Sequence, residues 1–317
     1  MRKILNQLGK LRIPFLFIID FNVENSYIMP LNELENDVFF SIAGFSNMTT
    51  PIVSNTKPQL IIKKPIDFSR YSTAFNQVIE EMKQGNTYLL NLTFPTEIIV
   101  NLPLLELFCL SQAPFKLYFK DQFITFSPER FVQIENNVIK TFPMKGTIDS
   151  AIPHAQQQIL ANAKEHAEHV MVVDLLRNDL SIVAQKVRLQ RFRYINKIKA
   201  GTRELLQVSS EICGQLATHW QDHLGDLLLS LLPAGSISGT PKKQTLKIIK
   251  TVELQERGFF TGIFGYFDGH SLDSAVMIRF IEKQGEQFFY RSGGGLTIDS
   301  DCIEEYQEML AKVYLPI

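Results

Sequence analysis

Cysteine is scarce in this chain, and its placement excludes several kinds of site. The three cysteines are Cys109, Cys213 and Cys302; they lie far apart, and no two of them form a C-x-x-C pair. An odd number at such spacing indicates neither a disulfide framework nor a thiolate metal site. We therefore expect a protein of the reducing cytoplasm.

Long hydrophobic runs are also missing. No stretch approaches the roughly 20 apolar residues that a helix needs to span a bilayer. An early run, residues 13–19, follows basic residues as in a signal peptide, but it ends at Asp20 and has no small-residue cleavage site. We interpret this run as a strand, and we expect a soluble protein that does not bind membranes.

Neither sign of charge is in excess. Lysine and arginine total 32 against 33 aspartates and glutamates, which leaves a formal net charge of -1. Such a balance implies no general attraction to nucleic acid. With 317 residues, of which 45% are hydrophobic, the chain can bury a substantial core. A small-molecule ligand or a protein partner is the better expectation.

Apolar patterning predicts strands in groups. The groups are an N-terminal hairpin or meander over 15–31, a strand over 87–100, an antiparallel meander over 115–149, and strands over 258–269, 275–282 and 287–295. A polar, proline-bearing stretch at 46–69 is the best candidate for a connecting segment. Because helices come singly between these groups, the pattern favours an α+β fold with large antiparallel sheets over a doubly wound parallel fold.

Helical spacing predicts the remaining elements. Apolar residues recur at a helical period over 71–86, and the longest helical region covers about 154–178. A further helix is expected to begin at Pro241 with Thr240 as its cap. The last helix is expected over about 302–313.

Two of these helices carry glutamates three residues apart. The pairs are Glu165 with Glu168 and Glu305 with Glu308. Residues at this spacing share a helix face, so two such faces could bring four carboxylates together around a hard cation such as Mg²⁺. For either pair alone, a solvated face of an amphipathic helix is the simpler interpretation.

Glycine-rich segments at 233–243 and 292–301 stand before predicted helices. Backbone N–H groups at such places bind anions, although ordinary turns are the alternative and neither segment matches a nucleotide-binding motif.

Arg279, among apolar residues, is either a clamp for a carboxylate or an exposed strand residue. Lys312 follows Glu308 by four residues, which favours an ion pair within the helix over a contact with a bound carboxylate.

One lysine stands in an unusual place. In TFPMKGTID, residues 141–149, Lys145 lies between a proline-methionine pair and a glycine, in what reads as a tight apolar turn between two strand-like runs. Spacing alone favours a plain surface lysine at the end of a strand.

Seven segments, in this order, resemble motifs of the chorismate-utilising enzymes. They are FSPERF, FPMKGT, EHVMVVDLLRND, PAGSISGTPK, GIFGYFD, AVMIR and GGGLTIDSDCIEEYQE. The resemblance implies one chorismate-binding domain over 1–317, in which large antiparallel sheets pack as a sandwich with helices outside. Residues 1–69 would be a shortened, strand-rich N-terminal segment, followed by the family core over 70–317.

The residue before the Gly-Thr pair separates members of that family. Anthranilate-forming members carry alanine there, whereas aminodeoxychorismate-forming members carry lysine, as this chain does at Lys145. The resemblance implies that the Lys145 amine attacks C2 of chorismate and expels the C4 hydroxyl. Ammonia then adds at C4 and leaves 4-amino-4-deoxychorismate, for 4-aminobenzoate and folate biosynthesis. Attack requires a neutral amine, so we expect burial among apolar residues to lower the pKa of Lys145.

The resemblance also assigns the other roles. Glu129 would be the general acid, and later the base, for the leaving hydroxyl. Glu168 and Glu308 would hold Mg²⁺ directly, and Glu165 and Glu305 would act through water. The expected substrate contacts are Gly146, Thr147, Lys242, Tyr266, Arg279, Gly293, Gly294, Gly295 and Lys312. Ammonia is expected from a separate glutamine amidotransferase subunit.

Two other functions stay open. One is an anthranilate synthase component I, against which Lys145 and Gln207 argue, since many members carry histidine where Gln207 stands. The other is a non-catalytic chorismate-binding or partner-binding subunit, which would not need Lys145, Glu129 and both glutamate pairs intact. Water addition at C2 is disfavoured because Leu89 stands where water-adding members carry lysine.

Overall fold

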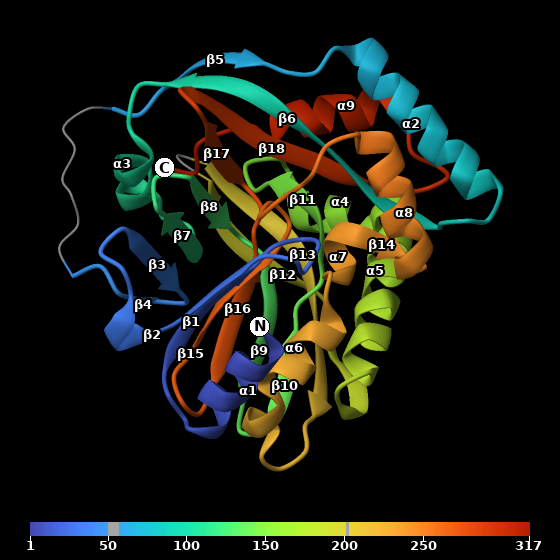
Figure 1. The fold of residues 1–317 in the computed structure, drawn as a ribbon. Coiled ribbons are helices and arrows are strands. Elements are labelled where there is room, and N and C mark those ends of the chain that lie inside the picture. Colours follow the sequence, from blue (N-terminus) through green and yellow to red (C-terminus); the bar gives the residue numbers. More distant parts are fainter. Residues whose placement is uncertain (50–56, 201–202) are drawn as a thin grey trace.

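The apolar segments of the chain pair into two large antiparallel sheets. The computed structural model describes residues 1–49, 57–200 and 203–317 (Figure 1). Within this part of the chain the strands form two nine-stranded sheets, and every described pairing is antiparallel. The expectation of an α+β fold with large antiparallel sheets is confirmed.

The two sheets draw strands from the whole length of the chain. The first sheet has the order β11 (Met144–Asp149), β13 (Arg203–Gln215), β10 (Val138–Thr141), β9 (Arg130–Glu135), β16 (Leu272–Val276), β15 (Ile263–Phe267), β1 (Phe15–Ile19) and β2 (Ser26–Pro30), and β12 (Gln185–Ala200) pairs with β13. The second has the order β14 (Gly239–Thr240), β6 (Leu89–Val100), β18 (Gln287–Leu296), β17 (Phe280–Gln284), β8 (Phe123–Ser127), β7 (Phe115–Phe119), β3 (Val38–Ile42) and β4 (Phe45–Ser46), and β5 (Leu60–Lys64) pairs with β6.

Strand β1 shows how the layers pack. All five of its residues are buried, because alternate side chains of a strand point to opposite faces and both faces are covered. Phe17 contributes to the core beneath the helices, whereas Leu16 joins Phe40 of β3 and Leu117 of β7 in a core between the two sheets. The strand interpretation of residues 13–19 and the sandwich of sheets are therefore both confirmed.

Helices cover the outside of the sheets. They are α1 (Arg2–Lys10), α2 (Phe68–Lys83), α3 (Leu104–Leu110), α4 (Ala155–Ala161), α5 (Ala163–Ser181), α6 (Leu224–Leu231), α7 (Gly235–Ser238), α8 (Lys242–Glu253) and α9 (Cys302–Ala311), with 3-10 turns at Leu31–Glu33 and Trp220–His223. Figure 1 shows α2, α8 and α9 together along one side of the molecule, where α8 contacts β6 and α9 contacts β18. None of the helices in the described ranges is long and apolar enough to cross a membrane.

Two predicted helix boundaries were wrong, and the N-terminal helix was missed. The helix expected over 154–178 is two helices, because the chain turns at Asn162, whose side chain accepts the backbone N–H of Glu165 and caps α5. Helix α8 begins one residue after Pro241, and Thr240 belongs to strand β14. Helix α1 was not predicted. Of the connecting segment expected at 46–69, residues 50–56 lie outside the described residues.

Two of the places where the chain crosses from one sheet to the other lie close together, and the sequence predicted neither of them. The meander expected over 115–149 divides after Ser127, so β7 and β8 lie in one sheet and β9 and β10 in the other. The run expected as one strand over 275–282 breaks before Phe280. The backbone N–H of Val276 donates to the carbonyl of Glu129 at 3.1 Å, and that of Phe126 to the carbonyl of Arg279 at 3.1 Å. Glu129 and Arg279 therefore lie close together where the sheets meet.

Candidate active site

Two adjoining cavities lie where the sheets meet helices α5 and α9. The inner cavity, about 210 Å³, extends to Glu129, and the outer cavity, about 700 Å³, is lined by the four glutamates at 165, 168, 305 and 308, of which Glu308 also lines the inner cavity. The residues that line both are Lys145, Gly146, Thr147, Arg279, Gly295, Glu308 and Lys312. The predicted site residues, except two discussed below, thus surround one continuous space.

Lys145 lies on strand β11 at an irregularity in its pairing with β13. The register shifts between Met144 and Thr147, and Gly146 has φ +83°, which glycine adopts without strain. The Lys145 ammonium lies 3.1 Å from an oxygen of Glu168. Burial lowers the pKa of Lys145, but the charge and hydrogen bond of Glu168, together with the charges of Glu308 and Glu165, outweigh burial and raise it. The expectation of a lowered pKa is wrong, because it considered only the neighbours in sequence.

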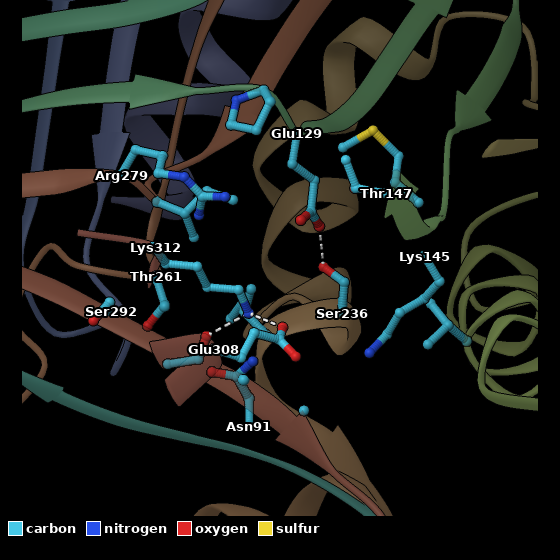
Figure 2. Close-up of a pocket in the computed structure, with 18 of the residues that line it drawn as sticks. Asn91, Glu129, Lys145, Thr147, Ser236, Thr261, Arg279, Ser292, Glu308 and Lys312 are labelled. Atoms are coloured by element: carbon cyan, nitrogen blue, oxygen red, sulfur yellow. Dashed lines mark hydrogen bonds and ion pairs between the residues drawn. The ribbon is translucent and has the colours of Figure 1, made fainter. Parts of the chain in front are cut away.

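Glu129 lies at the first crossing, between β8 and β9. Figure 2 shows its carboxylate entering the cavity from a different side than Lys145, with Arg279 and Lys312 opposite that lysine. The Ser236 hydroxyl donates to Glu129 Oε1 at 2.5 Å. Burial raises the pKa of Glu129, and the Ser236 hydrogen bond and the nearby cations oppose this effect without cancelling it. A carboxyl that holds its proton to higher pH than usual suits a general acid.

The glycines at 293–295 belong to strand β18, which confirms the strand expected over 287–295, although they also begin the glycine-rich segment 292–301. A side chain at Gly295 would lie 3.4 Å from the Lys145 nitrogen, and one at Gly294 would lie 3.2 Å from an oxygen of Glu305. Glycine at these positions keeps the cavity open beside the lysine. Lys312, next to the end of α9, donates to the carbonyl of Gly293 at 2.8 Å and pairs with Glu308 at 2.7 Å, which confirms the predicted intrahelical pair.

The four glutamates carry more negative charge than their lysine partners balance. Burial and the neighbouring Glu168 raise the pKa of Glu165, and burial and Glu308 raise that of Glu305. Burial raises the pKa of Glu308, but Lys312, together with the charges of Lys145 and Lys164, outweighs burial and lowers it.

Four carboxylates around one cavity match the oxygen-only donor set that Mg²⁺ favours. Among the described residues, no three His, Cys, Asp or Glu side chains are already gathered closely enough to bind one ion. Glu168 and Glu308 each face a lysine, so a bound cation would share or replace those ammonium partners. The donor set fits a hard divalent cation, and Mg²⁺ stays a prediction.

Two predicted substrate contacts lie elsewhere. Lys242 pairs with Asp179 at 3.1 Å, and Tyr266 stacks on Phe45 with their ring centroids 4.3 Å apart. Within the described part of the chain, neither side chain lines the inner or the outer cavity. The structure gives both residues packing contacts and does not bring them to the site.

Several residues of the inner cavity were not predicted. Besides Ser236, these polar residues are Asn91, Thr261, Arg291 and Ser292. Ser236 and Ser292 lie in the two glycine-rich segments that the sequence already marked, whereas the others lie in strand-like or loop runs without a distinctive pattern. Gln207, opposite Thr147 on β13, also lines this cavity, and its amide oxygen is buried without a partner among the described residues.

The sequence of the chain matches those of known proteins. Residues 24–316 match the model of the chorismate binding enzyme family. A PabA-like protein of Haemophilus influenzae is 51% identical over 98% of this chain and 95% of its own length. Aminodeoxychorismate synthase component 1 of Escherichia coli is 33% identical over 77% of this chain, which spans only 56% of that relative.

Solved structures share the fold. The menaquinone-specific isochorismate synthase of Escherichia coli superimposes with a TM-score of 0.76 over 98% of this chain and 79% of that protein, at 16% identity. That likeness concerns the fold alone, whereas the family match covers most of the sequence. The chain belongs to the family of chorismate binding enzymes.

Proposed function

We propose that this protein is an aminodeoxychorismate synthase component I, which converts chorismate and ammonia to 4-amino-4-deoxychorismate. The observation that carries the proposal is the position of Lys145, whose amine enters the same cavity as the Glu129 carboxyl, beside glycine at 295. A nucleophile and a proton donor thus face one space large enough for a small ring. The aminodeoxychorismate synthase relatives support this choice of reaction.

The proposed conversion of chorismate proceeds in two steps. In the first, the neutral Lys145 amine forms a bond to C2, electron pairs shift through the conjugated ring, the C4–O bond breaks, and Glu129 gives its proton to the departing hydroxyl, which leaves as water. In the second, ammonia forms a bond to C4, the C2–N bond to Lys145 breaks, and Glu129 takes back a proton.

The other cavity groups hold the substrate. Arg279 and Lys312 offer cationic partners to the carboxylates of chorismate from the side opposite Lys145 (Figure 2). Glu168 and Glu308 would hold Mg²⁺, with Glu165 and Glu305 acting through water. The bound cation would supply positive charge for the ring carboxylate of chorismate and would offset the carboxylate charge that raises the pKa of Lys145.

A glutamine amidotransferase subunit is proposed as the source of ammonia in the cell. Free ammonium would replace it in vitro, because only ammonia enters the chemical step. Leu89, an apolar residue that lines the inner cavity, offers no amine that could activate water for attack at C2.

A product assay tests the proposal. Purified protein with chorismate, Mg²⁺ and ammonium should form 4-amino-4-deoxychorismate, identified by chromatography and mass spectrometry. Lys145→Ala should form none, whereas Lys250→Ala, which alters a lysine side chain that is 82% exposed, should match the unaltered protein. Formation of anthranilate, detected by its fluorescence, would favour the anthranilate synthase alternative. Chorismate binding without turnover would indicate a non-catalytic subunit.

A further inference from the structure

The pair of Asp179 and Lys242 lies behind the active site and touches none of the reacting groups. The Lys242 ammonium lies 3.1 Å from Oδ1 and 3.2 Å from Oδ2 of Asp179, so both carboxylate oxygens contact it. Asp179 is near the end of α5, and Lys242 is the first residue of α8. The pair therefore joins two helices across the segment that connects α6 to α8.

Both partners also lie against the main chain at or beside that connecting segment. Lys242 donates to the carbonyl of Leu231, at the end of α6, at 3.2 Å. Burial raises the pKa of Asp179, whereas the backbone N–H of Gly235 favours the charged form and so lowers it. A side chain at position 235 would come within 2.5 Å of Asp179 Oδ2, so the main chain passes close to this carboxylate. The pair thus fixes the main chain on both sides of residues 232–234 and immediately before Ser236.

Ser236 connects this anchor to the catalytic carboxyl. Its hydroxyl donates to Glu129, and Glu129, Ser236 and Asp179 line one small cavity of about 20 Å³. The other walls of that cavity are largely apolar, including Phe131, Leu176 and Leu231. In such surroundings a hydrogen bond to a carboxylate is strong, and its effect depends closely on distance.

We propose that Asp179 and Lys242 are positioning residues, which hold α7 so that Ser236 donates to Glu129. The inference deepens the proposed function, because it assigns how the general acid is held. Four groups face the Glu129 carboxyl, namely Lys145 of β11, Ser236 of α7, Arg279 of the second crossing and Lys312 beside α9. Of these, only Ser236 sits on the segment that the pair anchors, so loss of the pair changes this one contact.

The direction of the effect follows from the hydrogen bond. Donation from Ser236 favours the charged form of Glu129, so displacement of Ser236 raises the pKa of Glu129 further. The Asp179→Asn/Lys242→Gln variant removes both charges together, so its direct electrostatic effects on Glu129 oppose one another. A remaining shift therefore reports movement of Ser236. Replacing both partners also avoids the buried unpaired charge that could unfold a single variant.

The experiment titrates Glu129 directly. Carboxyl ¹³C NMR of the full chain, with the Glu129 signal identified by its absence in Glu129→Gln, is followed with pH in four proteins: the unaltered protein, Ser236→Ala, the Asp179→Asn/Lys242→Gln variant, and the combination. Circular dichroism confirms that each is folded. We expect an upward pKa shift in Ser236→Ala and in the pair variant, and no additional shift in the combination, because both act through one contact.

Two outcomes would overturn the inference: an unchanged Glu129 titration in the folded pair variant, or shifts that add in the combination. Turnover of chorismate, measured in parallel, should fall about 10- to 100-fold in the pair variant with little change in KM, as for a misplaced catalytic group. If the protein forms another product or none, the proposed function fails while the NMR titration still decides the inference. Asp174→Asn, on the same helix but in an exposed pair with Arg177, is the matched control and should leave the titration unchanged.

Discussion

Two lysines, Lys145 and Lys242, each pair with a carboxylate of helix α5. The two pairs have similar distances and burial, but the space around the two amines differs. Lys145 lies 3.1 Å from Glu168 near the start of the helix, and Lys242 lies 3.1 Å from Asp179 near its end. The side chains are 25% and 14% exposed in the first pair and 23% and 14% in the second. Distance and burial therefore do not distinguish the two pairs.

The space around each amine does distinguish them. Lys145 lines both cavities, beside glycine at 295, whereas Lys242 contacts the carbonyl of Leu231 and lies over the segment before Ser236. A lysine beside an open cavity can meet a substrate, and one enclosed by main chain can only hold structure. Cavity access, more than charge or burial, separates the proposed nucleophile from the proposed anchor.

The largest expected effect is on the cavity lysine. Lys145→Ala should lower turnover of chorismate by on the order of 10³-fold or more, because it removes the nucleophile of the first step. Circular dichroism and chorismate binding should show a folded protein that still binds substrate. Turnover within tenfold of the unaltered protein would show that the amine is not the nucleophile and that the comparison is mistaken.

Lys242, the enclosed lysine, should affect stability more than Lys145 does, because its ammonium partners a carboxylate and does not face the cavity. Lys242→Ala leaves Asp179 partly buried without its ammonium partner and should lower the free energy of unfolding by about 3 kcal/mol. Urea unfolding followed by fluorescence measures this difference, with Lys145→Ala as the comparison. A midpoint equal to that of the unaltered protein would mean that the Asp179 pair contributes no stability.

His169, between the two pairs on α5, gives a pH test. Its Nε2 contacts the Ser210 hydroxyl at 2.7 Å, and burial, with the charges of Arg193, His166 and Lys145, lowers its pKa to about 4. The unfolded chain, with a histidine pKa near 6.5, therefore binds more protons between these values, and folding stability falls as pH drops from 6.5 toward 4. The His169 contribution should be about 2 kcal/mol smaller at pH 5 than at pH 7.

The measurement compares urea unfolding of the unaltered protein and His169→Gln at both pH values. Acidic residues titrate in both proteins, so their contribution cancels in the difference. Equal loss of stability in the two proteins would show that His169 is not held neutral.

The smallest effect is expected at the exposed pair of the same helix. Asp174 and Arg177 are 57% and 51% exposed at the side chain and lie 2.6 Å apart. Asp174→Asn should change the free energy of unfolding by less than about 0.5 kcal/mol and leave turnover unchanged, because water screens such pairs. A loss of stability as large as that of Lys242→Ala would imply that an ion pair on α5 contributes this much whether it is exposed or enclosed.

Local pattern was enough to predict many of the elements. Helix α2, strand β6 and the start of α9 follow from apolar period and from the cap at Asp301, whose side chain accepts the N–H groups of Ile303 and Glu304. Helix α1 was missed although Leu5 and Leu8 have a helical spacing, because the apolar run that follows it suggested strands. Whether each of these elements was predicted depended on residues close to it in the sequence, within one or two helical turns.

The site depended on contacts that no local pattern contains. The crossings at Glu129 and Arg279 interrupt runs that look like continuous strands, and Arg279 adopts φ +53° there. The carboxylate that raises the pKa of Lys145 comes from α5, 23 residues later. The family motif identified Lys242 as important, and the structure shows that its contact is Asp179. The sequence was enough to predict most of the residues that belong to the site. The partner of each charged residue could be identified only from the folded structure.

The central claim, that Lys145 attacks the substrate, is tested most directly by mass spectrometry of the protein quenched during turnover of chorismate. The account predicts a fraction of protein heavier by chorismate less one water, with the added mass mapped to the peptide that contains Lys145 and lost on addition of ammonium. Turnover of chorismate to 4-amino-4-deoxychorismate with no adduct at any time point, or with an adduct on another residue, would contradict it.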